Sequence, residues 1–253
     1  HQLKEQQNQD MNRLQRALDI VFPEVNKLSW TRYSKAYMQL LSLYPCASSI
    51  ASEDIRNLRK ALEVKGRGRQ CKVTAEEIKE AAGNSIGNDD RAVAIEVQSM
   101  IALINTRADQ IDILNKKIEE FSLQLNSPIT SIPGISYITG MTILAEIGDI
   151  CDFPKAAKMI SYAGMDPRVH QSGSYDAAHM PISKHGSRYL RKALYQAVFT
   201  VCKYNQIFQS YYTKKRKEGK SHRCAQGHCV RKLIRVIYKL LTNNTAFDPA
   251  LIK

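Results

Sequence analysis

Acidic side chains are scarce in this sequence, and in one long stretch they are nearly absent. The 253 residues carry 24 Asp and Glu against 37 Lys and Arg, a formal charge of +13. Between Ser183 and Lys239 the only acid is Glu218. Charge of one sign at this density repels itself unless phosphates or counterions neutralise it, so it indicates a polyanionic partner. The alternative is a basic surface that only keeps the protein in solution.

Other absences narrow the class of protein. No apolar run approaches the roughly 20 residues that cross a bilayer, and no signal-peptide pattern opens the chain. The six cysteines are scattered and lack the density of a secreted disulfide scaffold, which favours reduced thiols in the cytoplasm. The chain begins at His1 without an initiator Met, and we expect that a further segment once preceded it.

Alternating strand patterns are also nearly missing, so the predicted fold is mostly α. A short β-hairpin is allowed only around residues 169–175. Helical patterns are predicted over Leu3–Val21, Trp30–Leu43 and Glu53–Leu62, and Thr74 with Glu77 forms a capping box that opens another helix.

The strongest periodicity runs over residues 91–126, which hold no Gly or Pro. Its apolar positions alternate in steps of four and three, the heptad seam of a coiled coil, with Asn115 as a polar seam position. We expect a coiled coil that joins copies into a dimer or tetramer, or alternatively one long helix of a bundle. The predicted domains are a helical connecting region, 1–126, and a compact helical domain, 127–253.

The second region contains a candidate helix-hairpin-helix. In it, Pro133 and Gly134 form a tight turn, and Ser136 precedes a helix over Tyr137–Ile147. A glycine turn at a helix N-terminus lets backbone N–H groups approach a phosphate. The alternative is a plain helical hairpin without a ligand.

Two later helices place basic residues opposite an apolar face. The helix after Ser187 turns Arg188, Arg191 and Lys192 away from its core positions, and the last helix does the same with Arg231 and Arg235. Both basic faces are candidate nucleic-acid contacts.

Two clusters could hold a metal, but none is assigned. The cysteines and histidines lack the spacing of a common zinc site, and the acids, more often solvated or capping residues, lack a partner carboxylate from elsewhere in the sequence. His222, Cys224, His228 and Cys229 invite zinc, and Glu146, Asp149 and Asp152 invite Mg²⁺. Ser172, in a Gln-Ser-Gly turn after Arg168, is a candidate nucleophile beside cations, although such a turn is most often only a turn.

Several blocks in order resemble the IS110 family of insertion-sequence transposases, relatives of the pilin-gene invertases. The blocks are Ser131–Ile135 with Thr142–Asp149, Tyr162–Arg168 with Gln171–Gly173, Ile182–Gly186 with Tyr189–Leu194, Arg231–Arg235, and Phe247–Pro249. Together they extend across about half of the chain.

The resemblance implies that Ser172 attacks a DNA phosphodiester and holds the strand as a phosphoserine during transposition. Four residues match basic positions of the family and become candidate phosphate contacts: Arg168, Lys184, Arg188 and Arg191. The resemblance also implies a guide (bridge) RNA, double-stranded DNA as substrate, and a prokaryotic, nucleoid-associated location. The family's N-terminal nuclease-like domain, whose four carboxylates bind Mg²⁺, has no counterpart here, so no cofactor is expected in this chain and its catalysis alone is incomplete.

A non-catalytic transposase remnant that binds nucleic acid and regulates a full-length relative remains the alternative. A helicase-loader or repair factor would explain Pro133 and Gly134, but neither Gln171–Gly173 nor the basic blocks that follow.

Overall fold

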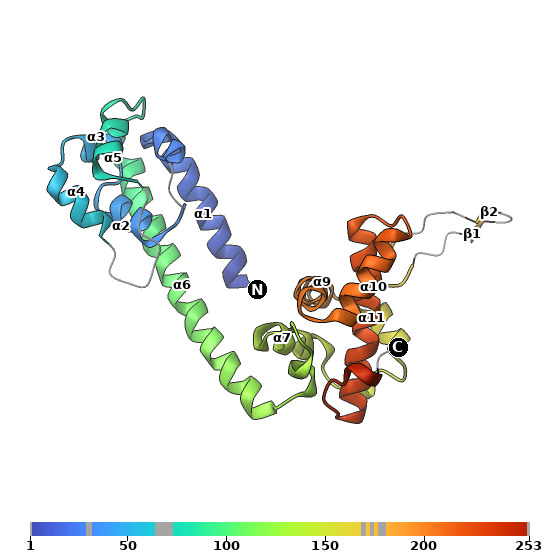
Figure 1. Ribbon diagram of the computed structural model, residues 1–253. Helices are drawn as coiled ribbons and strands as arrows, with labels where there is room; N and C mark the ends of the chain where they lie inside the picture. Colours follow the sequence, from blue (N-terminus) through green and yellow to red (C-terminus); the bar gives the residue numbers. More distant parts are fainter. Residues whose placement is uncertain are drawn as a thin grey trace. The chain divides into compact units, whose positions relative to one another are not determined.

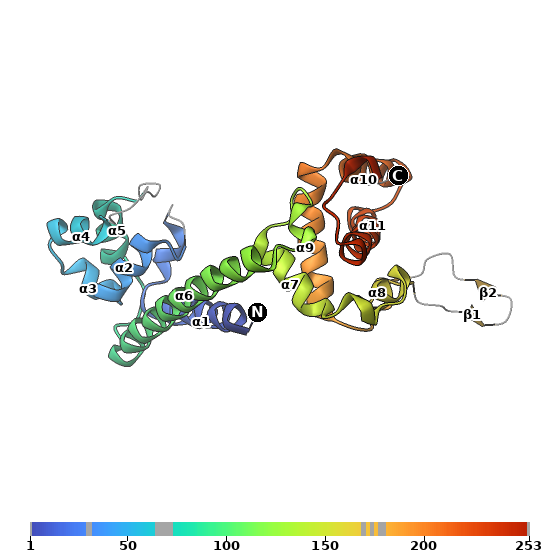
Figure 2. The same ribbon diagram turned by 90° about the horizontal axis from the view of Figure 1, so that it is seen from below.

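Helices dominate the computed structural model, which describes residues 2–28, 32–63, 73–167, 171–172, 175–176 and 181–251 (Figures 1 and 2). Side chains are described for these residues except 171–172, 175–176 and 251. The chain divides into two compact units, His1–Leu114 and Asn115–Lys253. No helix within the described ranges has the length and apolar character needed to span a membrane.

The first unit gathers short helices around the start of a long one. Its elements are α1 (Gln2–Val21), η1 (Pro23–Lys27), α2 (Lys35–Leu43), α3 (Ala47–Ala51), α4 (Ile55–Leu62), α5 (Ala75–Gly83) and the first part of α6 (Arg91–Leu125). Local caps set several helix starts. The predicted box at α5 is confirmed, because Thr74 Oγ1 accepts from Glu77 N at 3.2 Å while Glu77 Oε2 accepts from Thr74 N at 2.9 Å.

The predicted helix from residue 30 begins later than expected, at Lys35. Ser34 is the reason, because its hydroxyl accepts from the Tyr37 amide at 3.3 Å and caps α2. The predicted start at Glu53 likewise moves to Ile55, since the Asp54 carboxylate accepts from the Arg56 amide at 2.7 Å. Trp30 lies outside the described residues.

The long helix α6 is confirmed, but the first part of its seam is occupied within the chain. Val97, Ile101 and Ile104 are buried in one core with Leu14 and Leu18 of α1. The two helices lie side by side (Figures 1 and 2), and a further set of contacts joins them. Arg107 donates to Asp10 at 2.5 Å and to Gln6 at 2.8 Å. This part of the seam therefore packs on α1 and not on another copy, which corrects the prediction over these positions.

The second unit contains the remaining elements: η2 (Pro128–Ser131), α7 (Tyr137–Ile147), η3 (Ile150–Asp152), α8 (Ala156–Tyr162), β1 (Gln171–Ser172), β2 (Tyr175–Asp176), α9 (Arg188–Tyr204), α10 (Gln206–Lys217), α11 (His222–Asn243) and η4 (Pro249–Leu251). Where the sequence allowed a short hairpin, β1 and β2 pair antiparallel, with Gln171 opposite Asp176 and Ser172 opposite Tyr175.

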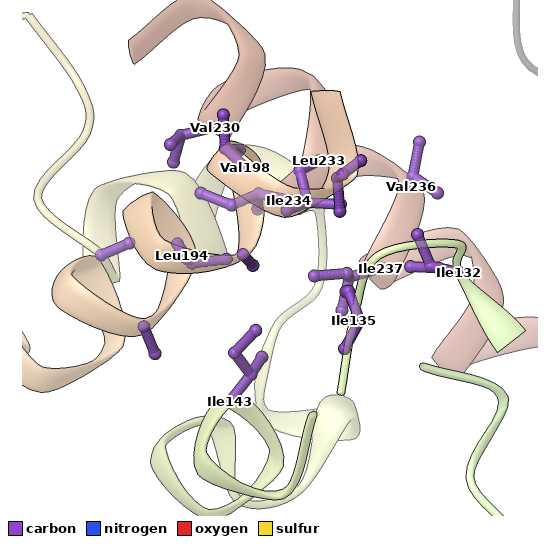
Figure 3. Packing of buried hydrophobic residues seen from close by; sticks show 14 of the residues in the cluster. Ile132, Ile135, Ile143, Leu194, Val198, Val230, Leu233, Ile234, Val236 and Ile237 are labelled. Carbon is purple, nitrogen blue, oxygen red and sulfur yellow. The ribbon is translucent and has the colours of Figure 1, made fainter. Parts of the chain in front are cut away.

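The core of this unit is built around α9, which contacts α7, α10 and α11. Figure 3 shows the packing, with Leu194 and Val198 of α9 among branched side chains of α7 and α11. The predicted inward residues of α9 are confirmed, since Leu190, Ala193, Leu194, Ala197, Val198 and Val201 are all buried. Because its apolar face is fixed on three neighbours, the opposite face of α9 is held toward solvent.

Candidate nucleic-acid interface

The segment that carries Ser172 leaves and re-enters the second unit at one closed base. Pro167 and Ile182 form an antiparallel bridge there. One step further in, the Ser183 amide donates to the Asp166 carbonyl at 2.8 Å, and the Ser183 hydroxyl donates to the Asp166 carboxylate at 2.6 Å. The two ends of the segment are therefore joined by backbone and side-chain hydrogen bonds at the same point.

Two glycines let the chain segments at this base approach closely. The Lys184 amide donates to the Gly164 carbonyl at 3.1 Å, and the Ser187 amide donates to the Tyr162 carbonyl at 2.9 Å. Gly164 and Gly186 have φ of +64° and +91°, and a Cβ at Gly186 would lie 2.1 Å from the Tyr162 oxygen. Glycine is needed at both positions, because a side chain would clash and the backbone is left-handed.

Ser187 links this base to α7 and to the start of α9. Its hydroxyl accepts from the Leu190 amide at 3.0 Å, which caps α9, and donates to Glu146 of α7 at 2.6 Å. Three of the sequence blocks noted above, on α7, after α8 and at the start of α9, thus meet at one place.

Arg191 also holds this base. Its Nη1 donates to the Ala163 carbonyl at 3.1 Å and to the Lys184 carbonyl at 3.3 Å. Lys184 itself is exposed and has φ of +57°, an uncommon conformation for a residue with a side chain. The structure therefore uses one of the predicted basic residues to shape the base and leaves another facing solvent.

The Asp166 carboxyl is held in its charged form. The hydrogen bond from Ser183 lowers its pKa below the ordinary value of 3.8, and the electrostatic interaction with His185 adds to this effect. A charged acceptor makes the bond to Ser183 stronger than a bond between neutral groups.

For the two residues predicted to act closest to the reacting phosphate, the structure gives the least information. Arg168 lies outside the described residues, and so does the side chain of Ser172, whose backbone belongs to β1. Their roles stay predictions.

The predicted helix-hairpin-helix differs from expectation in its first half, where η2 is a single 3-10 turn and not a helix. Pro133 and Ser136 are exposed, and Ser136 caps α7 by accepting from the Thr139 amide at 3.3 Å. Gly134, with φ of +98°, packs on α9, because a Cβ there would lie 2.7 Å from the Val201 backbone. The packing of the turn on α9 explains this glycine without a phosphate.

The basic residues of α11 differ in how exposed they are. Arg235 is exposed, whereas Arg231 is half-buried and its Nε has no hydrogen-bond partner within the described residues. Lys232, on the same helix, packs over the Tyr211 ring of α10 with its ammonium 4.8 Å from the ring centre. Arg235 is thus the more accessible of the two predicted contacts.

Neither cysteine–histidine nor carboxylate cluster forms a metal site. His222 Nδ1 pairs with the Tyr212 hydroxyl at 2.7 Å, and Cys229 is buried while Cys224 is exposed. Glu146 is engaged by Ser187. Among the residues that the structure describes, no group of three or more His, Cys, Asp or Glu side chains could hold a metal ion.

Two features of the interface were not predicted from the sequence. Asp166 and Ser183 meet only through the fold, and no local pattern marks their pairing. Phe199 is 66% exposed on the same face of α9 as Arg188 and Lys192. A signal for it was present, because these residues recur at helical spacing.

Comparison with known proteins finds sequences that are similar to the second half of the chain. Residues 126–213 match the family described as Transposase IS116/IS110/IS902 family. An uncharacterized 43.6 kDa protein of insertion element IS110 from Streptomyces coelicolor is 32% identical over 125 residues, 49% of this chain and 30% of that protein. The pilin gene-inverting protein of Moraxella bovis is 33% identical over 123 residues, 48% of this chain and 38% of that protein.

A looser similarity extends into the first half. The mini-circle putative transposase for IS117, from Streptomyces coelicolor, is 24% identical over 216 residues, which are 83% of this chain and 52% of that protein. The chain spans about a third of the length of the first two relatives.

Proposed function

Because the C-terminal half of this chain belongs to the IS116/IS110/IS902 transposase family and is related to pilin gene-inverting proteins, we propose that it handles DNA during transposition. The observation that carries the proposal is the closed base of the Ser172 segment. There, three separated blocks meet through the Asp166–Ser183 and Glu146–Ser187 hydrogen bonds. A base held this firmly can present one serine to a substrate repeatedly in the same geometry.

The proposed chemistry is a reversible phosphoryl transfer. The Ser172 Oγ attacks a backbone phosphorus and loses its proton, the P–O bond to the 3′ oxygen breaks, and that oxygen leaves as a 3′-hydroxyl. A 3′-hydroxyl of another strand then attacks the phosphoserine, which rejoins DNA and restores the serine. No nucleotide cofactor is needed, because the phosphoserine conserves the energy of the broken bond.

Cationic side chains of this chain would bind the DNA phosphates. The proposed phosphate contacts are Arg168, Lys184, Arg188, Lys192 and Arg235, together with the half-buried Arg231. Arg191 would act on the base of the segment, given its two bonds to backbone carbonyls. Pro133, Gly134 and Ser136 remain proposed as a backbone contact at the N-terminus of α7.

Serine needs a base, a metal or an activating environment to react at neutral pH. We propose that a carboxylate domain of the kind found in the family supplies it, together with Mg²⁺. We also propose a guide RNA as partner, and self-association through the part of α6 beyond Ile111. In this scheme residues 1–126 connect and assemble protomers, and residues 127–253 bind DNA.

Covalent adduct formation tests the proposal. The protein that carries this chain is incubated with a DNA duplex bearing the insertion-sequence ends, and adducts that resist denaturant are resolved on a gel. Adducts should form with the parent protein, persist with Ser174→Ala, and vanish with Ser172→Ala. The second serine is a matched control, because it lies two residues from Ser172 in the sequence.

The second candidate function is a non-catalytic nucleic-acid-binding protein. The observation that favours it is the lack, over the described residues, of any carboxylate group suited to a metal. If no adduct forms in any of the three proteins while DNA still binds, this second function replaces the first.

A further inference from the structure

Five residues form one exposed stripe along α9, spaced by four, four, three and four positions. We refer to Arg188, Lys192, Gln196, Phe199 and Lys203 as the α9 stripe. The spacing keeps them on one side of the helix, opposite the apolar face buried against the neighbouring helices. At a rise of 1.5 Å per residue the stripe is about 22 Å long, the length of about six stacked nucleotides.

The charge of the stripe has one sign. Three of its members are cations, and α9 contains no Asp or Glu. Lys203 lies over the ring of Tyr204, itself 63% exposed, with 5.4 Å from the ammonium to the ring centre. A polyanion would neutralise the positive charge of such a surface, whereas a protein partner would need a matching acidic face.

Phe199 is the feature that phosphate binding alone does not explain. It is 66% exposed, although the leucines and valines of α9 are buried. Single exposed apolar residues are common on proteins. This one, however, lies between Lys192 and Lys203 in line with both, and cations beside an aromatic ring are the combination that binds single-stranded nucleic acid.

The position of the stripe indicates which strand it would bind. The stripe starts at Arg188, one residue after Ser187, and the Ser187 amide bonds to Tyr162 at the base of the Ser172 segment. Strand cleavage and exchange, the proposed function on which this inference rests, must open base pairs next to the attacked phosphodiester. The strand leaving that point has unpaired bases that can stack on Phe199.

We propose that the α9 stripe binds unpaired DNA next to the cleavage site, with Phe199 stacking on a base and the cations contacting phosphates. Duplex DNA hides its base faces, so the ring contributes only to single-strand binding. The cations contribute to both, since every strand carries phosphates.

The test compares the affinity of the 253-residue chain for one mixed-sequence DNA strand, for its duplex and for the matching RNA strand, by fluorescence anisotropy. Phe199→Ala should weaken single-stranded DNA binding by about 5- to 100-fold. Duplex binding should change by less than about twofold, and Phe199→Trp should restore the loss. Lys192→Gln should weaken both DNA forms and reduce the salt dependence of each.

Leu43→Ala provides a control, because Leu43 is a large apolar residue that is 55% exposed on α2, outside the α6 segment proposed for self-association. It should leave every affinity unchanged. Equal loss of single-strand and duplex affinity in Phe199→Ala, no loss at all, or a loss confined to RNA would each overturn the inference. These readings need no covalent adduct, so a failure of the serine chemistry is distinguished from a failure of the stripe.

Discussion

The Ser183 hydroxyl donates a 2.6 Å hydrogen bond to the Asp166 carboxylate, across the base of the segment that carries Ser172. Ser183 is buried and Asp166 is half-buried. Removing the hydroxyl by Ser183→Ala should lower the free energy of unfolding by about 1–2 kcal/mol. Thermal or urea unfolding measures this. Ser210→Ala, at an exposed position of α10, is the control and should have little effect.

The same pair predicts how stability depends on pH. Because the folded-state pKa of Asp166 is lowered from 3.8, its contribution is present above the unfolded pKa and is lost as pH falls through the folded pKa. Asp166→Asn removes this pH-dependent contribution to stability. The difference in melting temperature between parent and variant should therefore be largest near neutral pH and shrink in acid. A difference that stays constant down to acid pH would show that the carboxylate charge contributes nothing.

Gly134 and Gly148 allow the packing of the Pro133–Gly134 turn to be tested. Both have positive φ, +98° and +69°, but a Cβ at Gly134 would meet the α9 backbone while one at Gly148 meets nothing within 4 Å. Gly148→Ala should cost about 1–3 kcal/mol from backbone strain alone. Gly134→Ala adds the clash and should cost about 2–5 kcal/mol in urea unfolding. Equal costs would mean that the turn does not need its close contact with α9.

Ser187 combines a helix cap with the bond to Glu146, and both depend on one hydroxyl. Ser187→Ala should lower the free energy of unfolding by about 1–3 kcal/mol, whereas Ser187→Thr keeps the hydroxyl and most of the stability. Ser136→Ala removes the cap of α7 and an exposed hydroxyl contact with Thr139, and should cost about 1 kcal/mol. If the two alanine variants lose the same amount, the bond to Glu146 contributes nothing measurable.

Local signals in the sequence predicted much of the helical fold. Thr74 and Glu77 identify the start of α5 and Ser187 that of α9, because each cap involves residues within one helical turn. The period of apolar residues likewise identified α6 and the buried face of α9. Such features need no knowledge of the rest of the chain.

Contacts between distant segments could not be predicted in this way. The heptad pattern of α6 predicts that Val97 and Ile101 are buried, but not against which partner. Helix α1 of the same chain and a helix of a second copy would bury them equally well. The conformation of Gly134 depends on its close contact with α9, which lies far along the chain. The Asp166–Ser183 hydrogen bond also requires a closed base, and the sequence around either residue alone does not predict it.

The most direct test of the central claim identifies the residue that carries DNA in the adduct. After the adduct is trapped in denaturant and the DNA is trimmed by nuclease, peptides spanning Gln171–Ser174 are fragmented by mass spectrometry. The account predicts one nucleotide phosphate on Ser172 and none on Ser174. A nucleotide on any other residue, or a Ser172 that stays unmodified while DNA is cleaved, would contradict it.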